Sequence, residues 1–206
     1  MGYGFLDIAA TPAVRAAQQA NGVGALWDNP GIDRPNDRFT AAEAGFIAER
    51  DSFYLASVSE TGWPYVQHRG GPAGFLKVLD DRTLALADFR GNRQYISLGN
   101  LSANDRVALI LMDYPNRARL KIYGRASYVD LAADADLAER VATPGYRGRP
   151  ERTLQVRLEA FDWNCAQHIT LRFTAGEIAG AFAPERARLA QLEAENNALR
   201  ARLAAL

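Results

Sequence analysis

The sequence has little of the chemistry that disulfide-bonded or metal-binding proteins need. Cys165 is the one cysteine among 206 residues, so no disulfide can form within the chain, as suits a reducing compartment. The two histidines, His68 and His168, are too few to complete a typical zinc site with that cysteine. A catalytic pair of Cys165 and His168 is conceivable, but no residue pattern that would orient it is present.

Net charge and long apolar runs are also missing. The 24 basic and 24 acidic residues give a formal charge of zero, so no overall field would attract nucleic acid or a membrane. Any anion site must therefore be local. No apolar run approaches the roughly 20 residues that cross a bilayer, and residues 1–20 lack the basic start and apolar core of a signal peptide. We expect a soluble, cytoplasmic protein without a nucleic-acid or membrane partner.

Glycine-rich nucleotide motifs are absent as well. Neither the phosphate-binding pattern G-x-x-x-x-G-K-[ST] nor the dinucleotide pattern G-x-G-x-x-G occurs, and Gly22-Val23-Gly24 follows no predicted strand. A chain of this length, with 48% hydrophobic residues, is large enough for one domain with an appended segment.

The clearest positive signal is a series of short β-rich runs between Phe53 and Val129. The runs are FYLASVS (53–59), FLKVLD (75–80), TLALAD (83–88), RVALILMD (106–113) and RLKIYGRASYV (119–129). Two further strands are predicted, at about residues 65–69 and 154–163. Closely spaced strands with turn residues between them favour a small barrel over a layered parallel sheet. The predicted fold class is mainly β with flanking helices (α+β).

Helix signals flank these strands. Thr11-Pro12 begins a short helix that Asn21-Gly22 ends, and the capping box Thr40–Glu43 begins a second that runs to about Arg50. Residues 23–39 are predicted to be a loop anchored by Trp27, and residues 94–101 and 131–142 to be helical. We expect three parts: N-terminal helices and loop (1–50) packed on the barrel, the barrel (51–180), and a C-terminal helix (184–206).

The C-terminal segment, RARLAQLEAENNALRARLAAL (186–206), has a heptad pattern. With Leu189 at position a, Leu203 and Asn196 take the other a positions, and Leu192, Leu199 and Leu206 fall at d. One Asn among leucines at a favours a parallel two-stranded coiled coil. The flanking charges agree, because Arg188 would face Glu193 of a partner chain and Glu195 would face Arg200. The alternative is an amphipathic surface helix packed on its own domain.

Two polar insertions between the strands, QHRGG (67–71) and DFRGNRQ (88–94), point to an anion site. They are expected to bring one group of side chains around a single cleft: Arg69, Lys77, Asn92, Arg93 and Gln94. A phosphate needs donors from several directions, which a forked arginine and a helix start supply. Each of these residues also has an explanation that needs no ligand. Asn92 could cap the following helix, and Arg93 could simply be solvated. Lys77 could lie on the solvent face of its strand, and residues 67–71 could form a polar rim.

The stretch FLKVLDDRTLALADFRGNRQYI (75–96) resembles the core of the pyridoxamine 5'-phosphate oxidase-like flavoproteins, the FMN-binding split β-barrels. The resemblance extends over about Phe53–Val129. It implies that Lys77 and Arg93 contact FMN, the arginine mainly at the phosphate. It also implies flavin contacts from Ala87 and Asp88, and a position near the flavin ring for Arg119. Gln67 and His68, next to Arg69, join the candidate cofactor-binding residues.

The sequence also departs from that family. Pro72 stands where the family has a phosphate-binding arginine, with Arg69 three residues earlier, and Asn92 and Gln94 replace a serine and a lysine. The C-terminal Arg-x-x-Arg-Leu-x-Pro pattern that serves vitamin B6 recognition is absent, and FDWNCAQHITLRF (161–173) takes its place. The resemblance therefore implies FMN binding, and not oxidation of pyridoxamine phosphate.

The resemblance further implies a homodimer with two flavins at the subunit interface. Residues 163–168 are the candidate segment that reaches the partner's flavin, with Trp163 stacking and Asn164 or Gln167 bonding the ring edge; a core position for Trp163 is the alternative. The predicted function is an FMN-dependent oxidoreductase of a small molecule. Other readings are a non-catalytic flavin carrier or redox sensor, a deazaflavin-binding barrel, and a haem protein with His68 or His168 as ligand.

Overall fold

The computed structural model describes residues 4–28, 34–164 and 166–205. The chain forms two compact units, one of residues 1–113 and 118–167 and the other of residues 114–117 and 168–206. Cys165, one half of the conceivable catalytic pair with His168, lies outside the described residues, as does Leu206, the last predicted heptad position.

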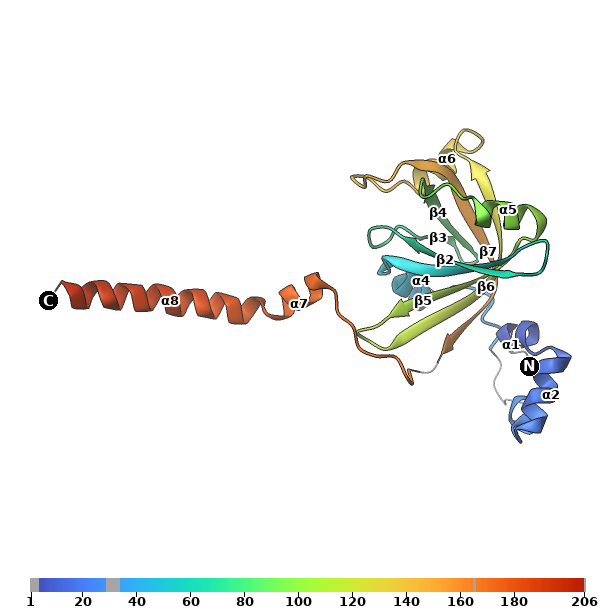
Figure 1. Cartoon of the computed structure of the whole chain (residues 1–206), viewed down its shortest axis with the longest axis horizontal. Coiled ribbons are helices and arrows are strands. Elements are labelled where there is room, and N and C mark those ends of the chain that lie inside the picture. Colours follow the sequence, from blue (N-terminus) through green and yellow to red (C-terminus); the bar gives the residue numbers. More distant parts are fainter. Residues whose placement is uncertain (1–3, 29–33, 165, 206) are drawn as a thin grey trace. The chain divides into compact units, whose positions relative to one another are not determined.

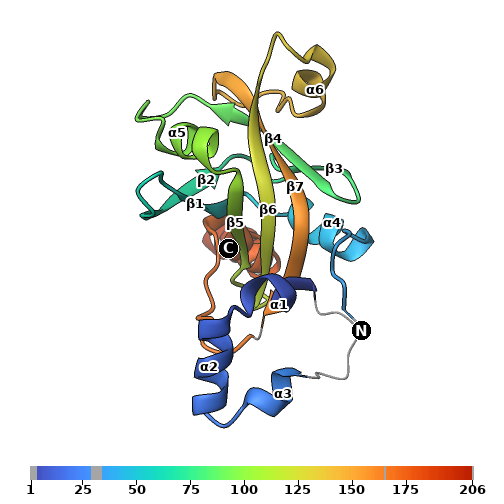
Figure 2. The ribbon, with the colours of Figure 1, turned by 90° about the vertical axis from the view of Figure 1, so that its right-hand side faces the viewer.

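The larger unit is built on one seven-stranded antiparallel sheet (Figures 1 and 2). The strand order is β2-β1-β5-β6-β7-β4-β3, so β2 and β3 are its two edges. The mainly β fold with flanking helices is confirmed. The strands are β1 (Ser52–Val58), β2 (Pro64–Gly70), β3 (Lys77–Asp80), β4 (Thr83–Phe89), β5 (Arg106–Asp113), β6 (Ala118–Asp130) and β7 (Pro150–Asn164).

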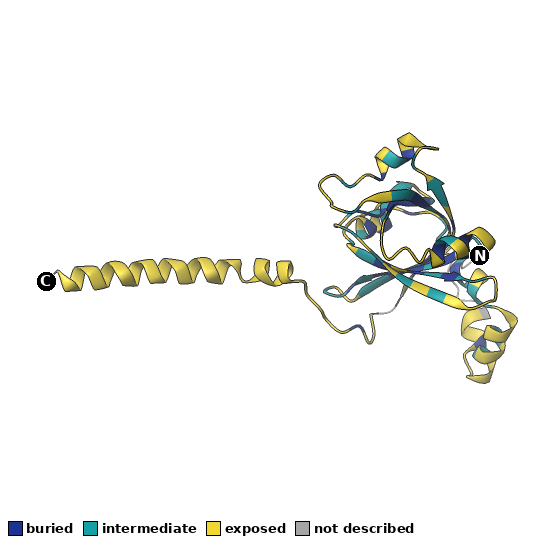
Figure 3. Cartoon of the chain, turned by 45° about the horizontal axis from the view of Figure 1, so that its top comes forward, coloured by how far each residue is buried: buried dark blue, intermediate teal, exposed yellow. Residues whose placement is uncertain are grey.

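Alternation along the strands produces the core. In β5, Val107, Leu109 and Leu111 are buried, while the residues between them are partly exposed. Side chains of a strand point alternately to its two faces, so this pattern buries one face of the curved sheet. Figure 3 shows that buried face turned inward, away from solvent. The long strands β6 and β7 change register at Gly124, where a Cβ atom would lie 2.6 Å from the carbonyl oxygen of Arg157.

Eight helices surround the sheet or follow it in the described residues. They are α1 (Gly4–Ala9), α2 (Pro12–Ala20), α3 (Gly24–Asp28), α4 (Ala41–Ala48), α5 (Ile96–Ala103), α6 (Ala135–Arg140), α7 (Ala175–Ala181) and α8 (Ala183–Ala204). The predicted caps of α2 and α4 are present: Thr11 accepts from the Val14 amide, and Thr40 and Glu43 form the capping box. Ile47 of α4 is fully buried, and Phe46 packs against the core at its side.

The N-terminal region differs from the expectation. Residues 23–39 are not one loop, because α3 lies within them and contains Trp27, the predicted anchor, which is 37% exposed. Residues 29–33 of that predicted loop lie outside the described residues. Helix α1, which the sequence did not signal, packs through Phe5, whose ring stacks on Tyr123 with 4.5 Å between centroids.

Two other helices begin later than predicted. Helix α5 was predicted to begin at residue 94 but begins at Ile96. Tyr95 has a left-handed backbone (φ 53°), which does not fit within a right-handed α-helix. Helix α6 starts at Ala135 because the Asp134 side chain accepts a hydrogen bond from the Leu137 amide and so caps the helix there.

The smaller unit carries the C-terminal helices. A second capping box, Thr174–Glu177, begins α7, and the single residue Phe182 separates α7 from α8. Both helices are exposed along their whole described length (Figure 3). Within the helices that the structure describes, none has the length and hydropathy of a membrane-spanning segment.

Candidate functional site

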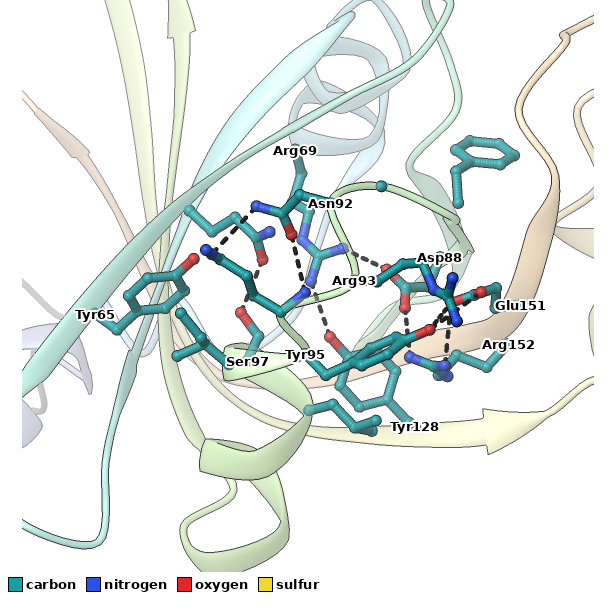
Figure 4. A pocket seen from close by; sticks show the side chains of 16 residues that line it. Tyr65, Arg69, Asp88, Asn92, Arg93, Tyr95, Ser97, Tyr128, Glu151 and Arg152 are labelled. Atoms are coloured by element: carbon teal, nitrogen blue, oxygen red, sulfur yellow. Dashed lines mark hydrogen bonds and ion pairs between the residues drawn. The ribbon is translucent and has the colours of Figure 1, made fainter.

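A cleft of about 210 Å³ opens in the larger unit (Figure 4). Strand β2, the end of β4, the loop of residues 90–95, the start of α5, and the neighbouring ends of β6 and β7 surround it. Its lining is polar and rich in arginine and tyrosine. The lining residues are Tyr65, Gln67, Arg69, Asp88, Phe89, Gly91, Asn92, Arg93, Gln94, Tyr95, Ile96, Ser97, Leu98, Tyr128, Glu151 and Arg152.

Asp88 is the centre of this cleft. Its buried carboxylate pairs with Arg69 through one oxygen and with Arg152 through the other, at 3.2 Å for the second pair. The register of the sheet explains the second contact, since Asp88 of β4 lies opposite Arg152 of β7. Directly opposed residues of antiparallel strands have side chains on the same face. Asp88 thereby fixes two arginines at the floor of the cleft.

Tyr128 holds the first of those arginines from the other side. The Arg69 guanidinium donates a hydrogen bond of 2.9 Å to the Tyr128 hydroxyl. Burial raises the pKa of Tyr128 above its usual value near 10, and the neighbouring Arg69 charge opposes that rise only in part. The phenol therefore stays neutral at physiological pH and accepts the bond without adding a charge.

Arg152 is held even more closely. Its guanidinium carbon lies 5.1 Å from the ring centroid of Tyr95 and 5.6 Å from that of Tyr128, which are cation–π distances. Glu151 lies 3.3 Å from the same guanidinium and also accepts from the Tyr95 hydroxyl at 3.2 Å. Arg152 is thus fully engaged by its own chain.

The loop of residues 90–95 has an unusual backbone. Arg93 and Tyr95 both have left-handed φ angles, 63° and 53°, which cost about 1–3 kcal/mol each for residues other than glycine. The Asn92 side chain accepts a hydrogen bond of 3.1 Å from the Gln94 amide and so stabilises the turn. Residues 92–94 therefore do not open the following helix, and Asn92 does not cap it; they form a separate strained loop at the rim.

Arg93 is the cation of this cleft that remains available. In the part of the chain that the structure describes, its exposed side chain makes no hydrogen bond or ion pair. The three lining arginines face two lining carboxylates, Asp88 and Glu151, so the lining carries one excess positive charge. The excess lies at the rim, where an anion from solvent can reach it.

Further donors point to the same conclusion. Nε of Arg69 is buried and has no hydrogen-bond partner, although its other nitrogens are engaged. The Ser97 hydroxyl is held by Gln67 at 2.9 Å, beside the exposed amides of Asn92 and Gln94. An unpaired buried donor is costly, so its presence beside a cleft fits a ligand with acceptor oxygens. The donor set suits a phosphate.

Six of the sequence-predicted residues therefore lie together: Gln67, Arg69, Asp88, Asn92, Arg93 and Gln94. Lys77 and Ala87 do not line the cleft. Lys77 of β3 lies opposite Ala85 of β4, and Ala85 and Ala87 pack with α6 on the face of β4 away from Asp88. The expectation that Lys77 joins the cleft is thus not met, because strand parity turns it to the other face.

His68 is also turned away. It lies between Gln67 and Arg69 on β2, so its side chain is on the outer face of the sheet, where its ring meets Tyr54 edge-on at 5.5 Å.

A last group lies at the far end of the same strands. Arg119 and Tyr128 are nine positions apart on β6, which corresponds to roughly 30 Å at about 3.3 Å per residue. Trp163, opposite Leu120 near that end, packs edge-on against Phe46 of α4 at 4.8 Å and donates to Glu43 at 2.7 Å. Gln167 ends this unit, and the side chain of Asn164 lies outside the described part of the structure. Arg119, Trp163 and Gln167 do not line the cleft.

Comparison with known proteins identifies the family. The family model described as pyridoxamine 5'-phosphate oxidase matches residues 39–160, which is more than half of the chain. The chain belongs to the pyridoxamine 5'-phosphate oxidase family. All residues that line the cleft fall within the matched segment. No curated protein matched the chain.

Solved structures similar to this family member are distant in sequence. An FMN-binding protein from Syntrophomonas wolfei is 16% identical, with a TM-score of 0.46, 71% of this chain and 97% of that chain covered. The FAD binding protein from Mycobacterium smegmatis is 16% identical, with a TM-score of 0.43 and coverage of 62% and 95%. A protein related to general stress protein 26, from Clostridium acetobutylicum, is 16% identical, with a TM-score of 0.44 and coverage of 66% and 94%.

Several cleft residues of this family member were missed by sequence reasoning. They are Tyr65, Tyr95, Ser97, Tyr128, Glu151 and Arg152. Tyr65 was within reach, because it shares a face of β2 with Gln67 and Arg69. Arg152 stands in a basic stretch that looks like a solvated link, and only the pairing of β7 with β4 reveals its place.

Proposed function

We propose that this protein binds FMN in the cleft around Asp88 and works as a homodimeric, FMN-dependent oxidoreductase of a small molecule. The observation that carries the proposal is the state of the three arginines. Two are held inside the cleft by carboxylates and tyrosines, and Arg93 stands without a partner in the described chain at the rim. Such a site attracts one dianionic group at its mouth and orients it with fixed donors.

The phosphate end of FMN fits this arrangement. A forked guanidinium makes short, charge-assisted bonds to phosphate oxygens. Arg93 would supply them, the amides of Asn92 and Gln94 would bond further oxygens, and Nε of Arg69 would gain the acceptor that it lacks. The resemblance of residues 75–96 to the FMN-binding split barrels gives Arg93 the same role.

The family supports a redox role for the bound group. A flavin would supply two-electron transfer, and the protein would supply binding, orientation and electrostatics. Tyr128, kept neutral by burial, and the Asp88 carboxylate hold the cleft arginines in place before any ligand arrives. A preorganised site of this kind binds without the cost of ordering its own side chains.

Two chains are part of the proposal. The cleft, about 210 Å³, is smaller than the 300–1,000 Å³ typical of small-molecule sites. Arg119, which the resemblance places near the flavin ring, lies roughly 30 Å along β6 from Tyr128 of the cleft, and Trp163, the candidate for stacking on the ring, lies near the same end. One flavin can meet both groups only if a second chain brings its Arg119 end to the cleft. A dimer resolves both observations.

The outer face of the sheet offers a surface for that second copy. Tyr54 and Val66, on neighbouring strands β1 and β2, are 42% and 60% exposed, and His68 lies on the same face. A mainly apolar hollow of about 580 Å³ borders this face, lined in part by Ala56, Ala108 and Tyr123. Exposed apolar surface of this kind marks interaction sites, and we assign it to the homodimer.

Titration of three proteins with FMN and with riboflavin tests the phosphate assignment. Arg93→Ala should weaken FMN binding about 10- to 100-fold, the value of a lost hydrogen bond to a charged group, and should leave riboflavin binding nearly unchanged. Arg147→Ala is the matched control, since Arg147 is exposed in a loop of the larger unit, has no partner in the described chain and does not line the cleft. Fluorescence quenching of the flavin gives both affinities.

An Arg93→Ala protein that binds FMN as tightly as the wild type would contradict the assignment. Equal weakening of FMN and riboflavin would also count against it, because that result indicates general damage to the cleft and no contact with the phosphate.

A further inference from the structure

Helix α8 carries a row of leucines that are exposed in the described part of the chain. Leu189, Leu192, Leu199 and Leu203 are 56%, 44%, 56% and 70% exposed. Their spacings of three, seven and four residues place them along one side of the helix. An apolar stripe on an otherwise solvated helix requires a partner.

The stripe has the composition of a coiled-coil seam. With Leu189 at heptad position a, every a and d position from Leu189 to Leu203 is leucine except Asn196, which takes an a position. Counted back along the sequence, the same register puts the exposed Phe182, which separates the two helices, at a and the exposed Ile178 of α7 at d. Glu185, at d in the first turn of α8, interrupts the apolar row, so the uninterrupted seam begins at Leu189.

None of the four charges that flank the seam pairs with an opposite charge among the described residues. Glu193 and Arg200, both at e positions, have no hydrogen bond or ion pair among the described residues. At the g positions, Arg188 donates to Gln191 at 3.0 Å, and Gln191 donates to Glu195 at 2.9 Å. This places an ordered cation and an ordered anion beside the seam.

We propose that α8 binds α8 of a second copy of this chain in a parallel, in-register coiled coil. In that alignment each g residue faces an e residue of the other chain, so Arg188 meets the partner's Glu193 and Glu195 meets the partner's Arg200. Both pairs are of opposite charge, and each occurs twice by the two-fold symmetry. Asn196 meets the partner's Asn196, the arrangement by which one polar a position fixes register.

The proposal is independent of the flavin site. From Leu189 to Leu203 the seam spans just over two heptads, and short helices of this kind are marginal by themselves, so we expect the coil to act with other contacts between the two chains. The coil would also give the dimer a second contact, whose complementary charges favour pairing with an identical chain. The test uses the whole chain and measures only the pairing of α8 with α8 of a second copy.

Disulfide trapping in a Cys165→Ser background measures the pairing and its direction. Leu199→Cys puts a thiol at a d position, where the parallel coil holds it against the same residue of the partner; an antiparallel pair would place it elsewhere. Ala194→Cys is the matched control on the outer side of α8 (position f). In oxidised and reduced glutathione, the Leu199→Cys chain should form covalent dimers at least about tenfold faster than the control.

Charge reversal then tests the flanks. Added to the Leu199→Cys chain, Arg200→Glu should slow trapping, because it sets two glutamates opposite each other, and Glu195→Arg together with Arg200→Glu should restore the rate. Equal trapping of the two cysteine variants, or trapping that ignores both charge changes, overturns the parallel coil. Because these readouts leave the cleft untouched, their failure leaves the FMN assignment standing, and failure of FMN binding leaves the coil standing.

Discussion

Asp88 determines the electrostatics of the cleft more than any other single residue. Its side chain is 8% exposed, and it pairs with two arginines that are themselves 13% and 15% exposed. Charges taken out of water need such partners, since an unpaired buried charge is strongly unfavourable. The aspartate therefore does not oppose an anion at the rim; it neutralises the floor and leaves Arg93 as the available cation.

Removing the charge of Asp88 should be costly to the fold. Asp88→Asn removes the carboxylate that Arg69 and Arg152 share, and only Arg152 keeps another, Glu151. The substitution should lower the free energy of unfolding by about 3–5 kcal/mol. Asp81→Asn is the control, because the Arg38–Asp81 pair lies at the surface, where water and salt screen it, so its loss should change the free energy of unfolding little. Urea denaturation measures both. Equal, small losses in the two variants would show that the buried network does not stabilise this unit.

The sequence predicts those cleft residues whose positions depend on their neighbours in the chain. Asn92, Arg93 and Gln94 form one loop, and Arg69 lies in the polar end of β2, so each could be found from neighbouring residues. Lys77 shows the limit. Its face depends on its pairing with Ala85, and a shift of one residue would have turned it into the cleft. Arg152 depends likewise on a pairing between distant strands.

At the scale of elements, α4 shows a helix fixed by its first turn. Glu43 is buried and accepts from the Thr40 amide at 2.9 Å, the Thr40 hydroxyl at 2.6 Å and the Trp163 indole at 2.7 Å. Burial by itself raises the pKa of this carboxyl, but the hydrogen bonds from Thr40 and Trp163 outweigh it and bring the pKa below its ordinary 4.5. Trp163 thus ties α4 to the end of β7.

This shift predicts part of the acid sensitivity of the protein. A carboxyl with a lowered folded-state pKa contributes stability above its unfolded value, and that stability is lost as pH falls through the folded pKa. Glu43→Gln should therefore cost about 1–3 kcal/mol at pH 7, with the difference from wild type shrinking below about pH 4.5. Urea midpoints across this range measure it, with the exposed Glu60→Gln as control. A difference that stays constant with pH contradicts the account.

Helices and strands could be predicted where the spacing of apolar residues in the sequence matches the residues that the fold buries. Alternation in the run 106–113 gives β5 at the predicted bounds, because every second residue is buried. Helix α1 could not be predicted, since it is short and its residue Phe5 packs on Tyr123 and Lys121, which are distant in the sequence. Helix α5 was placed too early because the left-handed backbone of Tyr95 carries no sequence signal.

At the scale of the whole molecule, two independent features of one chain point to a second chain. In the larger unit, Arg119, a proposed ring residue, lies roughly 30 Å along β6 from Tyr128 of the proposed phosphate cleft, a separation that a dimer would bridge. In the smaller unit, α8 presents leucines and complementary charges to solvent. The sequence could suggest both, because heptads and family motifs are local patterns. The distance between the phosphate cleft and the proposed ring residues could be estimated only once the course of β6 in the sheet was known.

Sedimentation velocity, followed through the visible absorption of flavin and the ultraviolet absorption of protein, tests the central claim most directly. Purified protein mixed with a small excess of FMN should show a single boundary with the mass of two chains, and that boundary should carry one flavin per chain. Flavin that sediments only as the free small molecule, beside a colourless protein, would contradict the proposed function, whatever the mass of the protein boundary.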